Sequence, residues 1–212
     1  MGAGIFGKLL SSLEAVGDSI PDWRQSGCNL KYRLLDGIKS AFAVFFFQHP
    51  SLLDFQRAMQ ERKKRNNVET LLGVTGIPSD NQIRTLLDGI EPQAMGPVFD
   101  RALRIADEAG AIQPYRVLDG GVLLALDVLW YYSSKEIHCE HCLHRSHAGE
   151  TTYYHSAVAG AIVRPGNTAV LPVMMEPMRN GDGKEKQDCE HAAGKRWLMA
   201  HGKEYQWLQV TG

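Results

Sequence analysis

Gly121-Val-Leu-Leu-Ala-Leu-Asp-Val-Leu-Trp130 is a nearly continuous apolar run that one acid, Asp127, interrupts. The run has the length of a strand, and its branched and aromatic residues are typical of a buried one. A carboxylate in such a strand is costly unless it is paired, hydrogen-bonded or bound to a metal ion. Strand alternation offers another solution, in which Asp127 points outward. The residues alone leave both alternatives open.

Strand and helix patterns continue after this run. Three strands, a helix and a final strand are predicted over residues 135–139, 152–163, 168–174, 185–200 and 205–210. Arg164-Pro165-Gly166-Asn167 has the composition of a hairpin turn between two of these strands. The alternation of strands with a helix favours a mixed α/β (α+β) layer over a helical bundle.

The chain before Gly110 has helical periodicity instead. Apolar residues recur at three- and four-residue steps in a helix that Pro50 ends, at Leu30, Leu34, Leu35, Ile38, Ala41, Phe42 and Phe45. Further helices are predicted over residues 51–65, 68–72, 79–87 and 94–109. Ser51 is suited to cap the first of these, and Ser79 with Gln82 forms a capping box for the third. We therefore predict a helical region over residues 1–115 and an α/β region over residues 116–212.

The length and composition are those of a protein that can bury a hydrophobic core. The 212 residues, 44% of them hydrophobic, are enough to fold without disulfides. Lys and Arg total 23 against 24 Asp and Glu, so net charge neither favours nor excludes nucleic acid. The longest apolar run, residues 41–47, is far short of the roughly 20 residues that span a bilayer. We expect a soluble, cytoplasmic protein without a membrane partner.

Several ordered motifs occur in both regions. They are Pro50-Ser-Leu-Leu53, Pro78-Ser-Asp-Asn-Gln-Ile-Arg84, Leu126-Asp127, Tyr132-Ser-Ser-Lys-Glu-Ile-His-Cys139, Cys142-Leu143, Tyr153-Tyr-His155, Val163-Arg-Pro-Gly166, Val170-Leu-Pro172, Lys186-Gln-Asp-Cys-Glu190 and Lys195-Arg-Trp-Leu198. Together they resemble the N-terminal portion of bacterial insertion-sequence transposases of the DDE type, which have an RNase H-like catalytic domain. A series of motifs in order is a more specific signal than one short pattern.

The resemblance implies a function in DNA transposition. Asp127 corresponds to the first acid of the Asp-Asp-Glu triad, which in this family holds two Mg²⁺ (or Mn²⁺) ions for phosphodiester chemistry on DNA. Val128-Leu129 follow it where the family usually has Gly-Thr. Residues 206–212 resemble the strand that leads into the second acid. We therefore expect a truncated transposase: a partial RNase H-like mixed sheet with one helix, an incomplete triad and no catalysis by this chain.

A partial sheet has a further consequence. The elements that normally cover it are expected to be missing, which exposes an edge and an apolar face. Exposed edges and faces of this kind favour pairing with another chain. We therefore expect either marginal stability or self-association as a homo-oligomer.

Cysteine and histidine residues indicate a metal site. Cys139 and Cys142 have the spacing of half a zinc site, and Cys189 with His191, or His155, are candidates for its other half. The alternative is a pair of reduced thiols at a strand end. A zinc-stabilised DNA- or protein-interaction module without nuclease activity is accordingly the second functional hypothesis.

Basic residues gather in two places. The denser patch is Arg62-Lys-Lys-Arg65, and Lys195 with Arg196 forms a smaller one; Arg84 lies on the capped helix. The functional interpretation is contact with DNA phosphates through Arg62, Lys63, Lys64, Arg65, Arg84, Lys195 and Arg196. The other interpretation is a solvated helix end.

Overall fold

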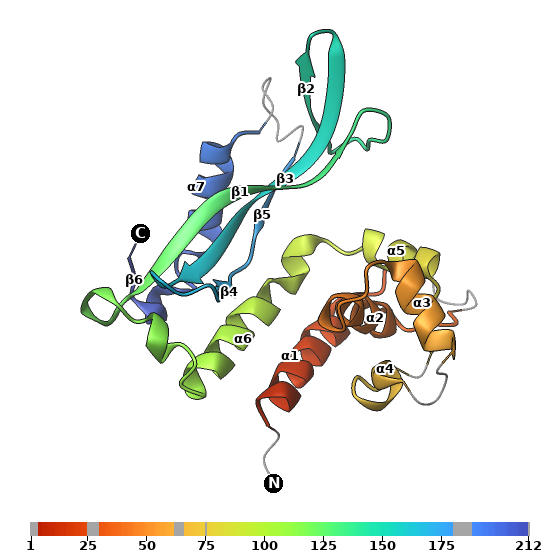
Figure 1. The fold of residues 1–212 in the computed structure, drawn as a ribbon, viewed down its shortest axis with the longest axis horizontal. Coiled ribbons are helices and arrows are strands. Elements are labelled where there is room, and N and C mark those ends of the chain that lie inside the picture. Colours follow the sequence, from red (N-terminus) through yellow and green to blue (C-terminus); the bar gives the residue numbers. More distant parts are fainter. Residues whose placement is uncertain (1–3, 25–29, 62–65, 75, 180–187, 212) are drawn as a thin grey trace. The chain divides into compact units, whose positions relative to one another are not determined.

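The structure is a computed structural model that describes residues 4–24, 30–61, 66–74, 76–179 and 188–211 (Figure 1). The chain forms two compact units, one up to Val98 and one from Phe99 onward. This division falls earlier than the change predicted at residue 115, because helix α6 (Gly96–Glu108) places Leu103 in the core of the second unit. Among the described residues no helix is long and apolar enough to cross a membrane.

The first unit is helical. Its elements are α1 (Ile5–Ser19), α2 (Leu34–Phe46), α3 (Leu52–Glu61), α4 (Asn67–Thr70), α5 (Asp80–Asp88) and the 3-10 turn η1 (Pro92–Met95). Both predicted caps are present: Ser51 Oγ accepts a hydrogen bond from the Asp54 amide at 3.0 Å, and Ser79 and Gln82 form the capping box. Phe55 and Ile83 are fully buried in a core that these helices share.

Helix α2 buries only part of the predicted face. Leu34 and Ile38 are buried as expected, but Phe45 is 83% exposed and Leu30 precedes the helix. Ala43 and Val44 take the buried positions in the last turn. The reason is that α2 contacts α1, α3 and α5, so its buried surface is wider than one stripe.

The second unit combines a six-stranded sheet with helices. Its strands are β1 (Val122–Ser134), β2 (Leu143–His147), β3 (Glu150–Val163), β4 (Leu171–Pro172), β5 (Glu176–Met178) and β6 (Val210–Thr211), and its other elements are α6, α7 (Glu190–His201), η2 (Gln113–Tyr115), η3 (Leu118–Gly120) and η4 (Gln206–Leu208). The order is β2-β3-β1-β6, with β4 and β5 also paired to β3. All pairs are antiparallel except β1 with β6, which run parallel after the α7 crossover. The predicted α+β class and mixed sheet are confirmed.

Two predicted strands differ from the structure. Residues 135–139 form a loop, and the strand paired with the start of β3 begins only at Leu143. Of the strand predicted over residues 168–174, only the two residues of β4 pair with β3. One further hydrogen bond, from the Val173 amide to the Gly160 carbonyl at 3.0 Å, follows this pair. The hairpin turn is as predicted, with the Asn167 amide donating to the Arg164 carbonyl at 3.1 Å and Gly166 at φ +78°.

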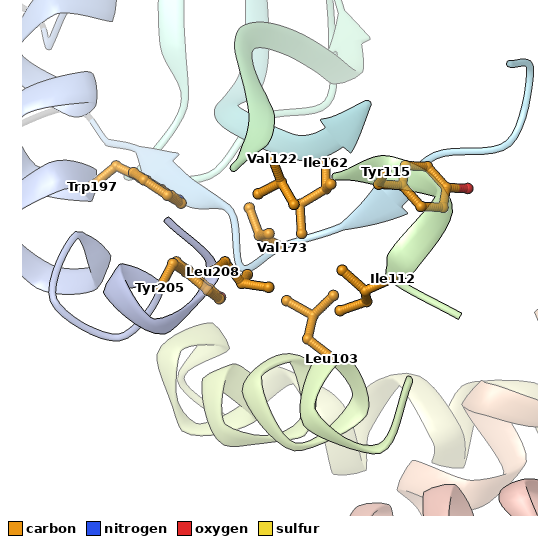
Figure 2. Close-up of a cluster of buried hydrophobic side chains, with 9 residues drawn as sticks. All are labelled: Leu103, Ile112, Tyr115, Val122, Ile162, Val173, Trp197, Tyr205 and Leu208. Atoms are coloured by element: carbon orange, nitrogen blue, oxygen red, sulfur yellow. The ribbon is translucent and has the colours of Figure 1, made fainter. Parts of the chain in front are cut away.

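The core of the second unit lies on one face of its sheet (Figure 2). Nine buried side chains meet there, from α6, α7, the strands and the connecting turns: Leu103, Ile112, Tyr115, Val122, Ile162, Val173, Trp197, Tyr205 and Leu208. Alternate residues of β1 point the other way, and Ala125, Asp127 and Leu129 are exposed. We call this second side, which carries Asp127, the open face.

Candidate metal centre

A tight turn brings the two cysteines together. The Cys142 amide donates to the Cys139 carbonyl at 3.2 Å, and the Cys139 amide donates to Cys142 Sγ at 3.3 Å. The two sulfur atoms lie 3.8 Å apart. The Cys-x-x-Cys spacing thus produces the paired thiols that the sequence predicts.

The third member of the centre comes from β3. His155 lies opposite Tyr132 of β1, next to a β-bulge between Trp130 and Tyr132. The ring of Tyr131 stacks on the imidazole with centroids 5.8 Å apart, and the ring of Tyr132 lies 5.7 Å from it at a 45° tilt. The antiparallel pairing of β1 with β3 therefore delivers His155 to the cysteine turn.

The three side chains lie close enough together to hold one metal ion. His155 Nε2 lies 3.3 Å from Cys139 Sγ and 3.3 Å from Cys142 Sγ. Tetrahedral Zn²⁺ with ordinary bond lengths separates two sulfur ligands by about 3.8 Å and a sulfur from a nitrogen by about 3.5 Å. All three ligand atoms lie within 4.8 Å of one another. A zinc ion therefore needs only small side-chain shifts to bind all three.

The electrostatic surroundings act in opposite directions on the two kinds of ligand: they favour the neutral imidazole of His155 and disfavour the thiolate of Cys142. Burial raises the pKa of the Cys142 thiol, and the neighbouring Cys139 thiol adds to this rise. Burial, helped by the charge of His141, lowers the pKa of His155, so its imidazole is neutral at neutral pH. A neutral imidazole is the ligand form, whereas the thiols release protons when they bind a metal. Metal affinity at this centre is therefore expected to rise with pH.

The predicted fourth ligand does not join this group. Cys189 is exposed at the N-cap of α7 and is not among the residues whose ligand atoms gather. Within the described ranges, Cys139, Cys142 and His155 form the one such group. Of the predicted zinc ligands, the structure thus brings together Cys139, Cys142 and His155.

The Asp127 side chain points outward, away from the core. It is exposed on the open face, and its Oδ1 accepts a hydrogen bond from the Val128 amide at 2.7 Å. Val128, which stands where the resembling family has Gly, packs on the other face with Leu143 and Val158. Its bulk is thus directed away from Asp127, whereas Leu129 shares the open face and is 49% exposed.

The metal centre and Asp127 share one face of the sheet. Asp127 pairs with Ala159 on β3, and His155 lies four positions before Ala159 on the same strand. Even spacing along a strand keeps side chains on one side, and four residues span about 13 Å. The open face thus carries a carboxylate at its middle and a thiol–imidazole cluster toward one end.

The predicted DNA contacts have different environments. Arg84 on α5 and Lys195 on α7 are exposed. Arg196 is ion-paired, with its Nε 2.9 Å from Glu176 Oε1 and its Nη1 3.0 Å from Asp188 Oδ1. We therefore retain Arg84 and Lys195 as candidate contacts and assign Arg196 to the fold. The predicted contacts Arg62, Lys63, Lys64 and Arg65 lie outside the described residues.

Asp188 responds strongly to Arg196. Burial alone raises the pKa of Asp188, but hydrogen bonds from the Arg196 guanidinium and its positive charge outweigh burial and lower that pKa. The Asp188 side chain is only 2% exposed. This pair anchors the start of α7 beside β5.

Comparisons with protein-family models, with curated proteins and with solved structures found no match to this chain. Its function is therefore argued from the motifs of the sequence and from the placement of the residues described above.

Proposed function

We propose that this chain acts in DNA transposition, as part of an insertion-sequence transposase of the DDE type with an RNase H-like second unit. The observation that carries the proposal is the position of Asp127. It stands exposed on β1, which pairs with β3 along its length and with the parallel strand β6 at Val122 and Leu123. An acid on the open face of this strand is accessible to a metal ion and to a DNA backbone.

The topology supports this assignment. Strands β1, β3 and β5 form an antiparallel set, and α7 then leads to β6 beside β1. This is the order of strands followed by one helix and one strand that the resemblance implies. Asp127 also keeps the outward orientation that the family role requires of its first acid.

The residues described do not make a two-Mg²⁺ site. Two divalent ions need several carboxylates, and within the described ranges Asp127 belongs to no group of three ligand atoms. We therefore derive no catalytic step through Mg²⁺ or Mn²⁺. DNA binding without cleavage is the expected activity of this chain, with Arg84 and Lys195 as candidate phosphate contacts.

Zinc is the second part of the proposal. The ligand distances favour one structural Zn²⁺ held by Cys139, Cys142 and His155. A bound ion would join the loop after β1 to a residue of β3, and its role would be to hold the far end of this hairpin. This centre also favours the alternative function, a zinc-stabilised DNA- or protein-interaction module that makes no use of Asp127.

A DNA-binding assay carried out with and without a divalent metal ion distinguishes the two functions. Fluorescence anisotropy with a labelled duplex is measured across a salt series, with and without Mn²⁺. In the transposase proposal Mn²⁺ strengthens DNA binding through Asp127, and Asp127→Asn removes this gain. Asp119→Asn is the matched control, because Asp119 is an exposed acid of the same unit away from the open-face position.

Each outcome has a clear meaning. Binding that depends on zinc but is indifferent to Asp127→Asn supports the interaction module. Absence of salt-dependent DNA binding contradicts both the transposase proposal and a DNA-binding module. DNA cleavage lost in Asp127→Asn would show that further acids complete the site.

A further inference from the structure

One irregularity in the sheet lies beside the metal centre. The register of β1 against β3 shifts between Trp130 and Tyr132, so Tyr131 is an extra residue in β1. A bulge of this kind re-aims the side chains that follow it. Tyr132 is the first residue after the shift, and it is paired directly with His155.

The hydroxyl of Tyr132 reaches the cysteine loop. Its Oη donates to the Ile137 carbonyl at 2.7 Å, two residues before Cys139. Ser134 fixes the same loop from the other side, since its Oγ accepts hydrogen bonds from the Glu136 and Ile137 amides at 3.1 and 2.9 Å. The path from β1 to Cys139 is therefore determined by side chains of β1 itself.

We propose that Tyr132 is the positioning residue of the metal centre, holding the imidazole of His155 with its ring and the cysteine loop with its hydroxyl. This inference rests on the proposed zinc site. Tyr131 also stacks on the imidazole, and Tyr153 of β3 stacks on His138 of the cysteine loop. Tyr132, however, is the residue whose ring lies against His155 while its hydroxyl bonds the backbone of that loop. With Tyr132 in place, the three ligand atoms lie within 4.8 Å of one another.

A second tyrosine provides the matched control. The ring of Tyr153 stacks on His138 with centroids 4.1 Å apart, so it lies in the same hairpin but contacts none of the three ligands in the contacts described. Tyr132→Phe and Tyr153→Phe each remove one hydroxyl and keep the ring. Only the first change releases the Ile137 carbonyl.

Affinity and spectroscopy together test the inference. Zinc affinity is measured by competition with a chromogenic chelator, and Co²⁺ replaces Zn²⁺ to report ligand number and geometry. Loss of an outer-shell partner typically weakens metal binding by about 10- to 100-fold. We expect Tyr132→Phe to bind about tenfold more weakly, with the sulfur-to-cobalt bands retained, and Tyr153→Phe to match the wild type.

A larger change tests the ring. Tyr132→Leu removes the hydroxyl and the aromatic contact with His155, so we expect a greater loss of affinity and a shift of the cobalt d–d bands. Circular dichroism of the metal-free variants checks that the rest of the chain folds as before.

The failures are distinguishable. A wild-type chain that binds no zinc refutes the zinc site on which the inference rests. A wild type that binds zinc together with a Tyr132→Phe variant of equal affinity overturns the positioning role and leaves the zinc site intact.

Discussion

Removal of zinc should loosen one end of the sheet and leave the rest of the second unit folded. We define the metal arm as residues 131–155, which include the end of β1, the cysteine loop, β2 and the start of β3. Between these limits only Cys142 and Leu143 are buried. Full burial of one leucine side chain contributes about 1.5–3 kcal/mol. That is too little to order a segment of this length against its conformational entropy.

The size of the zinc effect follows from mass action. When free zinc is 1,000 times its dissociation constant, binding stabilises the bound state by about 4 kcal/mol. Chelation should therefore lower the hydrogen-exchange protection of the metal arm by about three orders of magnitude. The core on the other face is built from nine buried side chains and contains no metal ligand, so its protection should change little.

Hydrogen exchange followed by mass spectrometry measures both regions in one sample. His155→Ala should reproduce the effect of the chelator, while His147→Ala, at an exposed histidine of the same arm, should not. Equal protection of the arm with and without zinc would refute the reasoning. An equal loss of protection in β6 and α7 would also refute it, because that result would mean that the metal stabilises the whole second unit and not the arm alone.

Three further predictions follow from the same structure. Trp197→Ala removes a side chain that is 1% exposed and should lower the free energy of unfolding by about 3–5 kcal/mol in urea denaturation, whereas Leu198→Ala, 56% exposed, should change it by less than about 0.5 kcal/mol. Asp188→Asn should lower the free energy of unfolding by about 2 kcal/mol at neutral pH. Arg196 lowers the pKa of Asp188 in the folded chain, so this stabilisation is present above the ordinary carboxyl pKa and is lost as the pH falls through the lowered pKa. The stabilities of wild type and variant should therefore converge in acid. Lys195→Gln should reduce the slope of log K against log salt by about 1 in a DNA titration, and an unchanged slope would remove Lys195 from the interface.

Local signals in the sequence predicted the elements that depend on local chemistry. Ser79 and Gln82 specify a helix start because their side chains satisfy backbone amides within one turn, and this start is confirmed. The apolar run around Asp127 is confirmed as a strand, and alternation places the acid outward. The Cys139 and Cys142 pair is likewise local, because the turn alone brings the two sulfurs together.

Features that depend on pairing between distant segments were not predictable in the same way. The choice of His155 over Cys189 follows from the register of β1 with β3, and no local pattern encodes that register. The loop at residues 135–139 has strand-like composition, but Ser134 and Tyr132 bond its backbone and divert it from the sheet. The exposed Phe45 shows the same limit, since the contacts of α2 with three other helices decide which side is buried.

The zinc content of the purified chain tests most directly the claim that two separate segments build one metal centre. Elemental analysis after removal of loosely bound metal should find one zinc ion per chain. The ion should be lost in Cys142→Ser and in His155→Ala, and retained in Cys189→Ser. A chain without zinc, or one that keeps its zinc in His155→Ala and loses it in Cys189→Ser, would contradict the account.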